Sequence, residues 1–163
     1  MTGAPVFPIV AFRDLDARQQ EAFLIAKLGG VLANHGFTCS RLTTDWEGAD
    51  LLAHRITGEV LRVQVKSRCT IAKKYVGKDL WIAYPAAWPG EWVLVEHDVL
   101  LEAIKTHAPR WLKTRSWTRQ GLYNSAHPSA ALLDALDRYR VAEDDIRFRC
   151  TGIGPDPAQR RRA

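Results

Sequence analysis

The sequence is poor in cysteine and has no long hydrophobic run, and each absence narrows the class of protein. Its 163 residues include three cysteines, Cys39, Cys69 and Cys150, without the CxxC or Cys/His spacing of a metal site. Such scattered thiols are typical of a reducing compartment, so we expect a cytoplasmic protein. No stretch of about 18 apolar residues is present, and the first residues do not resemble a secretion signal. We therefore expect no membrane partner.

The sequence also lacks internal repeats and long linkers, which favours a single domain. We expect that domain to cover residues 1–150 and residues 151–163 to form a loose basic tail, because the tail is rich in glycine, proline and arginine. The five histidines are dispersed, and none has an obvious nucleophile as its partner. Histidine-activated nucleophilic catalysis is therefore not the chemistry that this sequence favours.

Positive charge is in modest excess, with 23 Lys and Arg against 18 Asp and Glu and a net charge of +5. This excess suits a polyanionic partner but is also common in other proteins. Residues 105–119 hold no acid, and two tryptophans, Trp111 and Trp117, lie among their basic residues. The segment is either a nucleic-acid contact, with cations on phosphates and rings against sugars or bases, or a solvated loop with two core tryptophans.

Hydrophobic periodicity predicts one α/β or α+β domain, with a mixed sheet flanked by helices. Helices are expected at 14–34, at 98–108 with Asp98 as the cap, and at 127–141. Strands are expected at 37–42, 49–56, 60–68, 80–86, 91–97 and 145–150, with a turn at 57–59 and a basic loop at 71–79.

The segment "LRVQVKSR", residues 61–68, places an amide and an amine on the polar face of a strand. If 48–68 is a hairpin in which Ile56 pairs with Val60, Asp50 lies opposite Lys66, and Gln64 is the diagonal neighbour. All three side chains then share one face, and a slip of one residue would break the arrangement. Singly, each residue suits a turn or a solvated strand face. Together, on otherwise apolar strands, they favour a site.

These groups suit hydrolysis of a phosphodiester. Asp50 and the Gln64 carbonyl offer the oxygen ligands that Mg²⁺ or Mn²⁺ prefers, and the Val65 backbone carbonyl can complete the set. Lys66 can orient an attacking water, help it ionise, or offset the charge of a phosphate. Water, metal and phosphate are the components that such a reaction needs.

The motif "GAD" at 48–50, followed by "VQVK" at 63–66, resembles the PD-(D/E)XK nuclease superfamily. The resemblance covers roughly residues 14–105 and implies a restriction-endonuclease-like fold: a helix, a mixed sheet entered by a hairpin, then a helix and further strands. It matches Asp50 to the central aspartate, Gln64 to the (D/E) position and Lys66 to the lysine. It also matches Glu21, on the first helix, to a glutamate that reaches the same site.

Two positions depart from the family pattern. Ala49 stands where proline is common, and Gln64 stands where an acid is common, which removes one negative charge from the metal site. Metal affinity should fall unless Glu21 compensates. The QxK form is similar to small intron-encoded homing endonucleases that work as oligomers, which implies a dimer or tetramer acting on double-stranded DNA.

The leading prediction is therefore a Mg²⁺-dependent endodeoxyribonuclease, with homing as the role that the resemblance implies. A junction-resolving or repair nuclease fits the same residues. The rivals are a DNA-binding module without catalysis, in which Gln64 marks a lost metal site, and a plain interaction domain. The candidate DNA contacts are Ser67, Arg68, Lys73, Lys74, Lys78, Lys113, Arg115 and Arg119.

Overall fold

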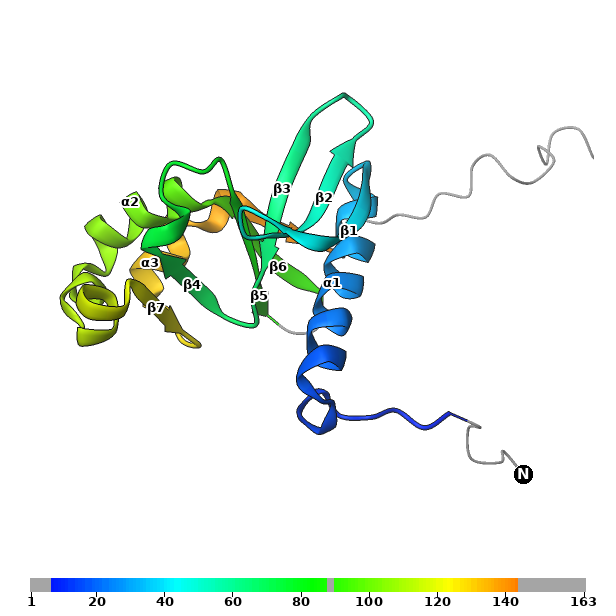
Figure 1. The fold of residues 1–163 in the computed structure, drawn as a ribbon, viewed down its shortest axis with the longest axis horizontal. Helices are drawn as coiled ribbons and strands as arrows, with labels where there is room; N and C mark the ends of the chain where they lie inside the picture. Colours follow the sequence, from blue (N-terminus) through cyan, green and yellow to red (C-terminus); the bar gives the residue numbers. More distant parts are fainter. Residues whose placement is uncertain (1–6, 88–89, 144–163) are drawn as a thin grey trace, which may run out of the picture.

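The fold is described from a computed structural model, which covers residues 7–87 and 90–143 (Figure 1). The predicted strand at 145–150 and the predicted tail at 151–163 lie outside the described residues. The described part is a mixed α and β structure, so the coarse fold class predicted from the sequence is confirmed.

Six strands form the main sheet, in the order β1-β2-β3-β5-β6-β8. Neighbouring strands are antiparallel except for β3 and β5, which run parallel, and this pair makes the sheet mixed as predicted. The strands are β1 (Phe37–Trp46), β2 (Ala49–Arg55), β3 (Val60–Val65), β5 (Trp81–Ala87), β6 (Glu91–Glu96) and β8 (Arg140–Ala142). A separate antiparallel ribbon pairs β4 (Cys69–Ala72) with β7 (Leu122–Ser125).

The helices cover the two faces of the sheet. Helix α1 (Ala17–Asn34) lies along one face, while α2 (His97–His107), α3 (Ala130–Ala135) and the β4–β7 ribbon lie on the other (Figure 1). A capping box in which Asp16 and Gln19 exchange hydrogen bonds begins α1. Within the described ranges, no helix combines the length and apolar character needed to cross a membrane.

Two hydrophobic clusters anchor these layers. Leu28 and Leu32 of α1 are fully buried against residues of β2, β3, β5 and β6. Leu100 and Ile104 of α2 are buried with residues of β4, β5, β6 and α3 in the second cluster. Since apolar side chains fill both faces, a polar group on the central strands needs a specific partner.

The crossover between the parallel strands β3 and β5 departs from the prediction. Residues 66–80 were expected to finish a strand and continue as a loop, but β3 ends at Val65, and β4 and a 3₁₀ turn (Lys73–Tyr75) follow. The next helix, α2, comes only after β6. The restriction-endonuclease-like arrangement therefore remains a hypothesis, whereas the order helix, hairpin and mixed sheet is observed.

Two further predictions about helices are wrong. The helix predicted at 127–141 ends at Ala135, because the chain turns back through a 3₁₀ segment so that β8 can pair with β6. Asp98 does not cap α2. Its carboxylate instead accepts a hydrogen bond from the Gly77 amide and contacts His97.

His97 joins α2 to β4 and makes stability depend on pH. Its ring is 1% exposed, Nε2 accepts a hydrogen bond from the Ala72 amide at 3.2 Å, and Nδ1 lies 3.1 Å from Asp98 Oδ1. Burial lowers the pKa of His97 below its ordinary 6.5, against the opposing effect of Asp98. The neutral ring is therefore the form that the folded protein holds.

We expect stability to fall as the pH drops below about 6.5, because the unfolded chain takes up the proton before the folded chain does. The loss should be complete once the pH lies below the folded pKa. Urea unfolding of the wild type and of His97→Gln between about pH 7.5 and pH 5 checks this expectation. The free energy of unfolding of His97→Gln should fall less steeply with falling pH than that of the wild type. Equal pH dependence in the two proteins would contradict this expectation.

Candidate active site

The β2–β3 hairpin sets the register of the site, and the predicted register is wrong by two residues. His54, not Ile56, pairs with Val60, so the same register places Asp50 opposite Gln64 rather than opposite Lys66. The cause is Gly58, whose φ of +104° places it at the left-handed position that ends a three-residue loop. Because a shift of two residues preserves the face of each side chain, the grouping survives.

Gly48, two residues before Asp50, is required by the turn between β1 and β2 and by the neighbouring Tyr75 ring. Glu47 and Gly48 form the two-residue connection between β1 and β2, and both have positive φ, of 56° and 94°. A Cβ on Gly48 would also lie 2.5 Å from Cε1 of Tyr75. The glycine thus leaves room for the Tyr75 ring under the site.

A cavity of about 350 Å³ brings the predicted catalytic residues together. It lies where the ends of β2 and β3 meet α1 and the 3₁₀ turn. Its lining includes Glu21, Asp50, Gln64 and Lys66, together with Thr43, Thr44, Gly48, Lys74 and Tyr75. The three central side chains therefore converge on one space rather than pointing to opposite faces of the sheet.

Asp50 is the acceptor at the centre of this cavity. Its Oδ2 accepts a hydrogen bond from the Val65 amide at 2.7 Å and another from Nε2 of Gln64. Burial raises the pKa of the Asp50 carboxyl, and Glu21 adds to the rise, while the Val65 amide and Lys66 oppose it. A nearby cation would relieve the cost of keeping this half-buried carboxylate ionised.

Gln64 is buried, and its amide nitrogen rather than its oxygen faces Asp50. The side chain is 6% exposed, and Oε1 accepts a hydrogen bond from the Tyr75 hydroxyl at 2.9 Å. In this orientation the amide satisfies the carboxylate as a donor. The Gln64 oxygen reaches a shared cation only after the amide turns over and Tyr75 accepts from its nitrogen.

Tyr75 is the site residue that the sequence analysis missed. It is 4% exposed, at the end of the 3₁₀ turn, and lines the cavity beside Gln64. Its position depends on the path of the crossover after β3, which the sequence predicted as a loop. The glycine at position 48 was the only local sign that a bulky group packs there.

Lys66 follows β3 directly and is fixed by its backbone, whose amide donates to the Ala83 carbonyl at 2.8 Å. Burial lowers the pKa of its ammonium, and Lys74 lowers it further, while Asp50 and Glu21 oppose the shift. A lysine with a lowered pKa exchanges a proton more readily than an exposed one. The side chain is thus suited to handle a proton as well as a charge.

Glu21 reaches the cavity from α1 but carries its own partner. Its Oε1 lies 2.9 Å from Nη2 of Arg41, and both side chains are about half exposed. An exposed pair of this kind contributes about 0–1 kcal/mol, so the carboxylate can exchange Arg41 for another cation at small cost.

The donor set fits a hard divalent ion that keeps several waters. Two carboxylates, of Asp50 and Glu21, line the cavity. The Val65 amide meets Asp50, and since a strand residue offers its amide and its carbonyl to the same neighbouring strand, we expect the Val65 carbonyl on the β2 side as well. Mg²⁺ keeps several waters and takes only one or two carboxylates from a protein, so these groups could hold it. Within 7–87 and 90–143, no group of three or more His, Cys, Asp or Glu is placed to hold a metal ion.

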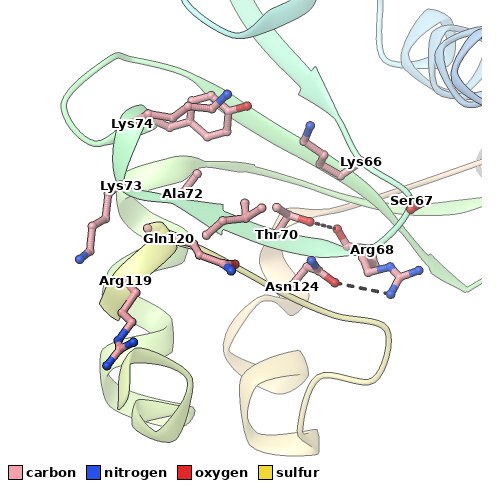
Figure 2. Close-up of a pocket in the computed structure, with 13 residues that line it drawn as sticks. Lys66, Ser67, Arg68, Thr70, Ala72, Lys73, Lys74, Arg119, Gln120 and Asn124 are labelled. Atoms are coloured by element: carbon pink, nitrogen blue, oxygen red, sulfur yellow. Dashed lines mark hydrogen bonds between the residues drawn. The ribbon is translucent and has the colours of Figure 1, made fainter. Parts of the chain in front are cut away.

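The predicted DNA contacts fall into two groups. Ser67, Arg68, Lys73, Lys74 and Arg119 line a second, larger cavity of about 850 Å³ beside the first (Figure 2). Lys113 and Arg115 are exposed but do not line it, and Lys78 is half-buried, with its backbone carbonyl bound by Arg62. Trp111 and Trp117 of the basic stretch pack against the core cluster of α2.

Comparison with known proteins does not add to this description. No family model, no curated protein and no solved structure matches this chain. The resemblance to the PD-(D/E)XK nucleases therefore depends on the motif residues and on their arrangement around the cavity.

Proposed function

We propose that this protein is a divalent-metal-dependent endodeoxyribonuclease that hydrolyses DNA phosphodiester bonds. The observation that supports this proposal is that Asp50, Gln64 and Lys66 line one cavity. The larger cavity lined by Ser67, Arg68, Lys73, Lys74 and Arg119, which we call the basic groove, lies beside it. Lys66 lines both. A cation site next to a phosphate-binding surface is the combination that metal-assisted phosphodiester hydrolysis requires.

The residues of the cavity have separate roles in this proposal. Asp50 and the Val65 carbonyl would hold Mg²⁺ or Mn²⁺, with Glu21 acting through water and Gln64 after its amide turns. A bound ion of this kind polarises a phosphate and lowers the pKa of a coordinated water. Lys66 would orient the attacking water for in-line displacement and offset the charge that grows on the phosphate.

The partner in this proposal is DNA, and the protein would act as a homo-oligomer. Cutting both strands of a duplex needs two active sites, so a dimer or tetramer is the expected assembly. Homing is the role that the QxK resemblance favours, and junction resolution or repair would use the same residues.

One observation favours a second candidate, a DNA-binding module that does not cleave. The Gln64 nitrogen already donates a hydrogen bond to Asp50, and the Tyr75 hydroxyl holds the amide in that orientation. If this arrangement is permanent, the basic groove would bind DNA beside a cavity that holds no ion.

The two candidates are separated by metal-dependent nicking of supercoiled plasmid. We expect nicked circles with Mg²⁺ or Mn²⁺, none with EDTA, and none from Asp50→Asn, which removes the charge at nearly constant size. Asp14→Asn, an exposed carboxylate on the 3₁₀ turn before α1, is the matched control. Electron paramagnetic resonance of added Mn²⁺ reads ion binding without a cognate DNA site. Salt-sensitive DNA binding with neither Mn²⁺ binding nor nicking would support the module instead.

A further inference from the structure

Three cavities share the residues that follow β3. Lys66, Lys74 and Tyr75 line both the active-site cavity and the basic groove. Ser67 and Arg68 line both the basic groove and a third, smaller cavity, the side pocket. The segment 66–68 thus separates three neighbouring cavities, with the basic groove in the middle.

The basic groove carries cations at several points along its length. The β4–β7 ribbon forms its floor, with Thr70 of β4 and Asn124 of β7 as paired residues. In Figure 2, Lys73 and Arg119 lie at one end, and Arg68, which donates to Asn124, lies at the other. Among the described residues that line it there is no acid. The groove therefore suits successive phosphates of one nucleic-acid strand.

The side pocket has a different character. Its volume is about 250 Å³, below the range of roughly 300–1,000 Å³ that drug-sized ligands occupy, so it suits a single ring system. Both apolar and polar residues line it: Ser67, Arg68, Cys69, Tyr84, Pro85, Ala86, Ala126, His127, Pro128 and Leu133.

The side pocket offers polar groups at its exposed rim. Arg68 and His127 are both exposed and line it. The Tyr84 hydroxyl, in contrast, is buried beside the Cys69 thiol, and the residue is 2% exposed. A guanidinium and an imidazole beside apolar side chains can lie against a base and hydrogen-bond to its edge.

We infer that the groove binds one unpaired DNA strand next to the cut bond and that the side pocket takes one unstacked base of that strand. A base in a duplex is stacked and paired, so it reaches a side pocket only after both contacts are lost, whereas a single strand can turn a base outward at small cost. The inference rests on the proposed function in that it takes DNA as the partner. It narrows the substrate class to flaps, overhangs and other DNA with an unpaired segment.

The affinity for single-stranded and duplex oligonucleotides of the same sequence tests the inference in EDTA, where no hydrolysis occurs. By fluorescence anisotropy, we expect the single strand to bind about tenfold more tightly than the duplex. Lys73→Ala with Arg119→Ala should lower the dependence of log K on log salt by roughly 1.4 for the single strand. Lys27→Ala, an exposed lysine on α1, is the matched control. Equal or tighter binding of the duplex would overturn the inference.

The side pocket is tested with His127→Ala, because His127 is exposed and lines this pocket but not the basic groove. Single-stranded oligonucleotides with one 2-aminopurine at successive positions should show one position that brightens on binding. His127→Ala should weaken binding about fivefold, and an abasic site at the bright position should remove that difference. No bright position, or unchanged affinity in His127→Ala, would contradict the base pocket.

These measurements separate the inference from the proposed nuclease activity. Preferred binding of single strands without metal-dependent nicking would support the inference and count against the nuclease. Nicking without a preference for single strands would support the nuclease and overturn the inference.

Discussion

Replacing Lys66 by alanine is expected to reduce metal-dependent nicking by about 10²–10⁴-fold, the usual contribution of a positioned proton-transfer group. The side chain lies in the wall shared by the active-site cavity and the basic groove, beside Asp50. In this position its ammonium can meet both the attacking water and the phosphate. The initial rate of conversion of supercoiled to nicked plasmid, at saturating Mg²⁺ or Mn²⁺, measures the effect.

Two further variants show which property of Lys66 matters. Lys66→Arg keeps the positive charge but cannot lose a proton, so we expect DNA binding to persist and the rate to stay low. Lys27→Ala should leave both rate and affinity unchanged. If Lys66→Arg restores the rate, charge alone is the role of this residue. An undiminished rate in Lys66→Ala would remove Lys66 from the mechanism.

The hairpin at the site illustrates what the sequence could and could not predict. Alternating apolar residues identified both strands, and the shared face of Asp50 and Gln64 followed from the period of two. The register was missed because the turn was placed on residues 57–59, although a glycine is the residue that tolerates the left-handed end of a three-residue loop. Placing Gly58 at that position would have given the observed pairing.

The β4–β7 ribbon had no comparable local signal. Ile71 in β4 pairs with Tyr123 in β7, about fifty residues away, and both strands are four residues long. Short strands that pair across such a distance depend on tertiary packing more than on their own pattern. The sequence therefore did not predict the β4–β7 ribbon that forms the floor of the basic groove, although it did suggest Lys73 and Arg119 as DNA contacts.

The hydrogen-bond and ion-pair partners of the predicted site residues could not be predicted from the sequence either, because tertiary packing decides them. Nothing in the sequence joins Glu21 to Arg41, or Gln64 to Tyr75, because each pair comes from different elements. The residue types of the site were predictable from the motif. Their hydrogen bonds, which decide whether Gln64 offers an oxygen or a nitrogen, were not.

The hydrogen bond from Gln64 to Asp50 leads to the second large prediction, for Gln64→Glu. The substitution places a second carboxylate against Asp50 in a site where residue 64 is 6% exposed. Without a cation, two buried like charges in contact should lower the free energy of unfolding by about 3 kcal/mol. For a chain of this length, the midpoint of thermal unfolding would fall by roughly 10 °C in EDTA.

Added Mg²⁺ should reverse this loss, because two carboxylates side by side bind a hard cation far better than a carboxylate and an amide nitrogen do. At a free ion concentration about 100 times the Kd, binding to the folded state alone would return about 2.7 kcal/mol. The wild type should show a much smaller response to Mg²⁺, because the Gln64 amide already satisfies Asp50. Thermal unfolding with EDTA and with increasing Mg²⁺ measures both responses.

The matched control is the exchange of the two groups, Asp50→Asn together with Gln64→Glu. It keeps one carboxylate and one amide in contact, so we expect stability in EDTA close to that of the wild type and no strong response to Mg²⁺. Comparing this double variant with Gln64→Glu alone distinguishes the effect of the added charge from the effect of the changed side-chain shape at either position. A single variant Gln64→Glu that is as stable in EDTA as in Mg²⁺ would mean that residues 50 and 64 do not share a cation. In that case the ion site, and with it the metal-dependent mechanism, would have to be abandoned.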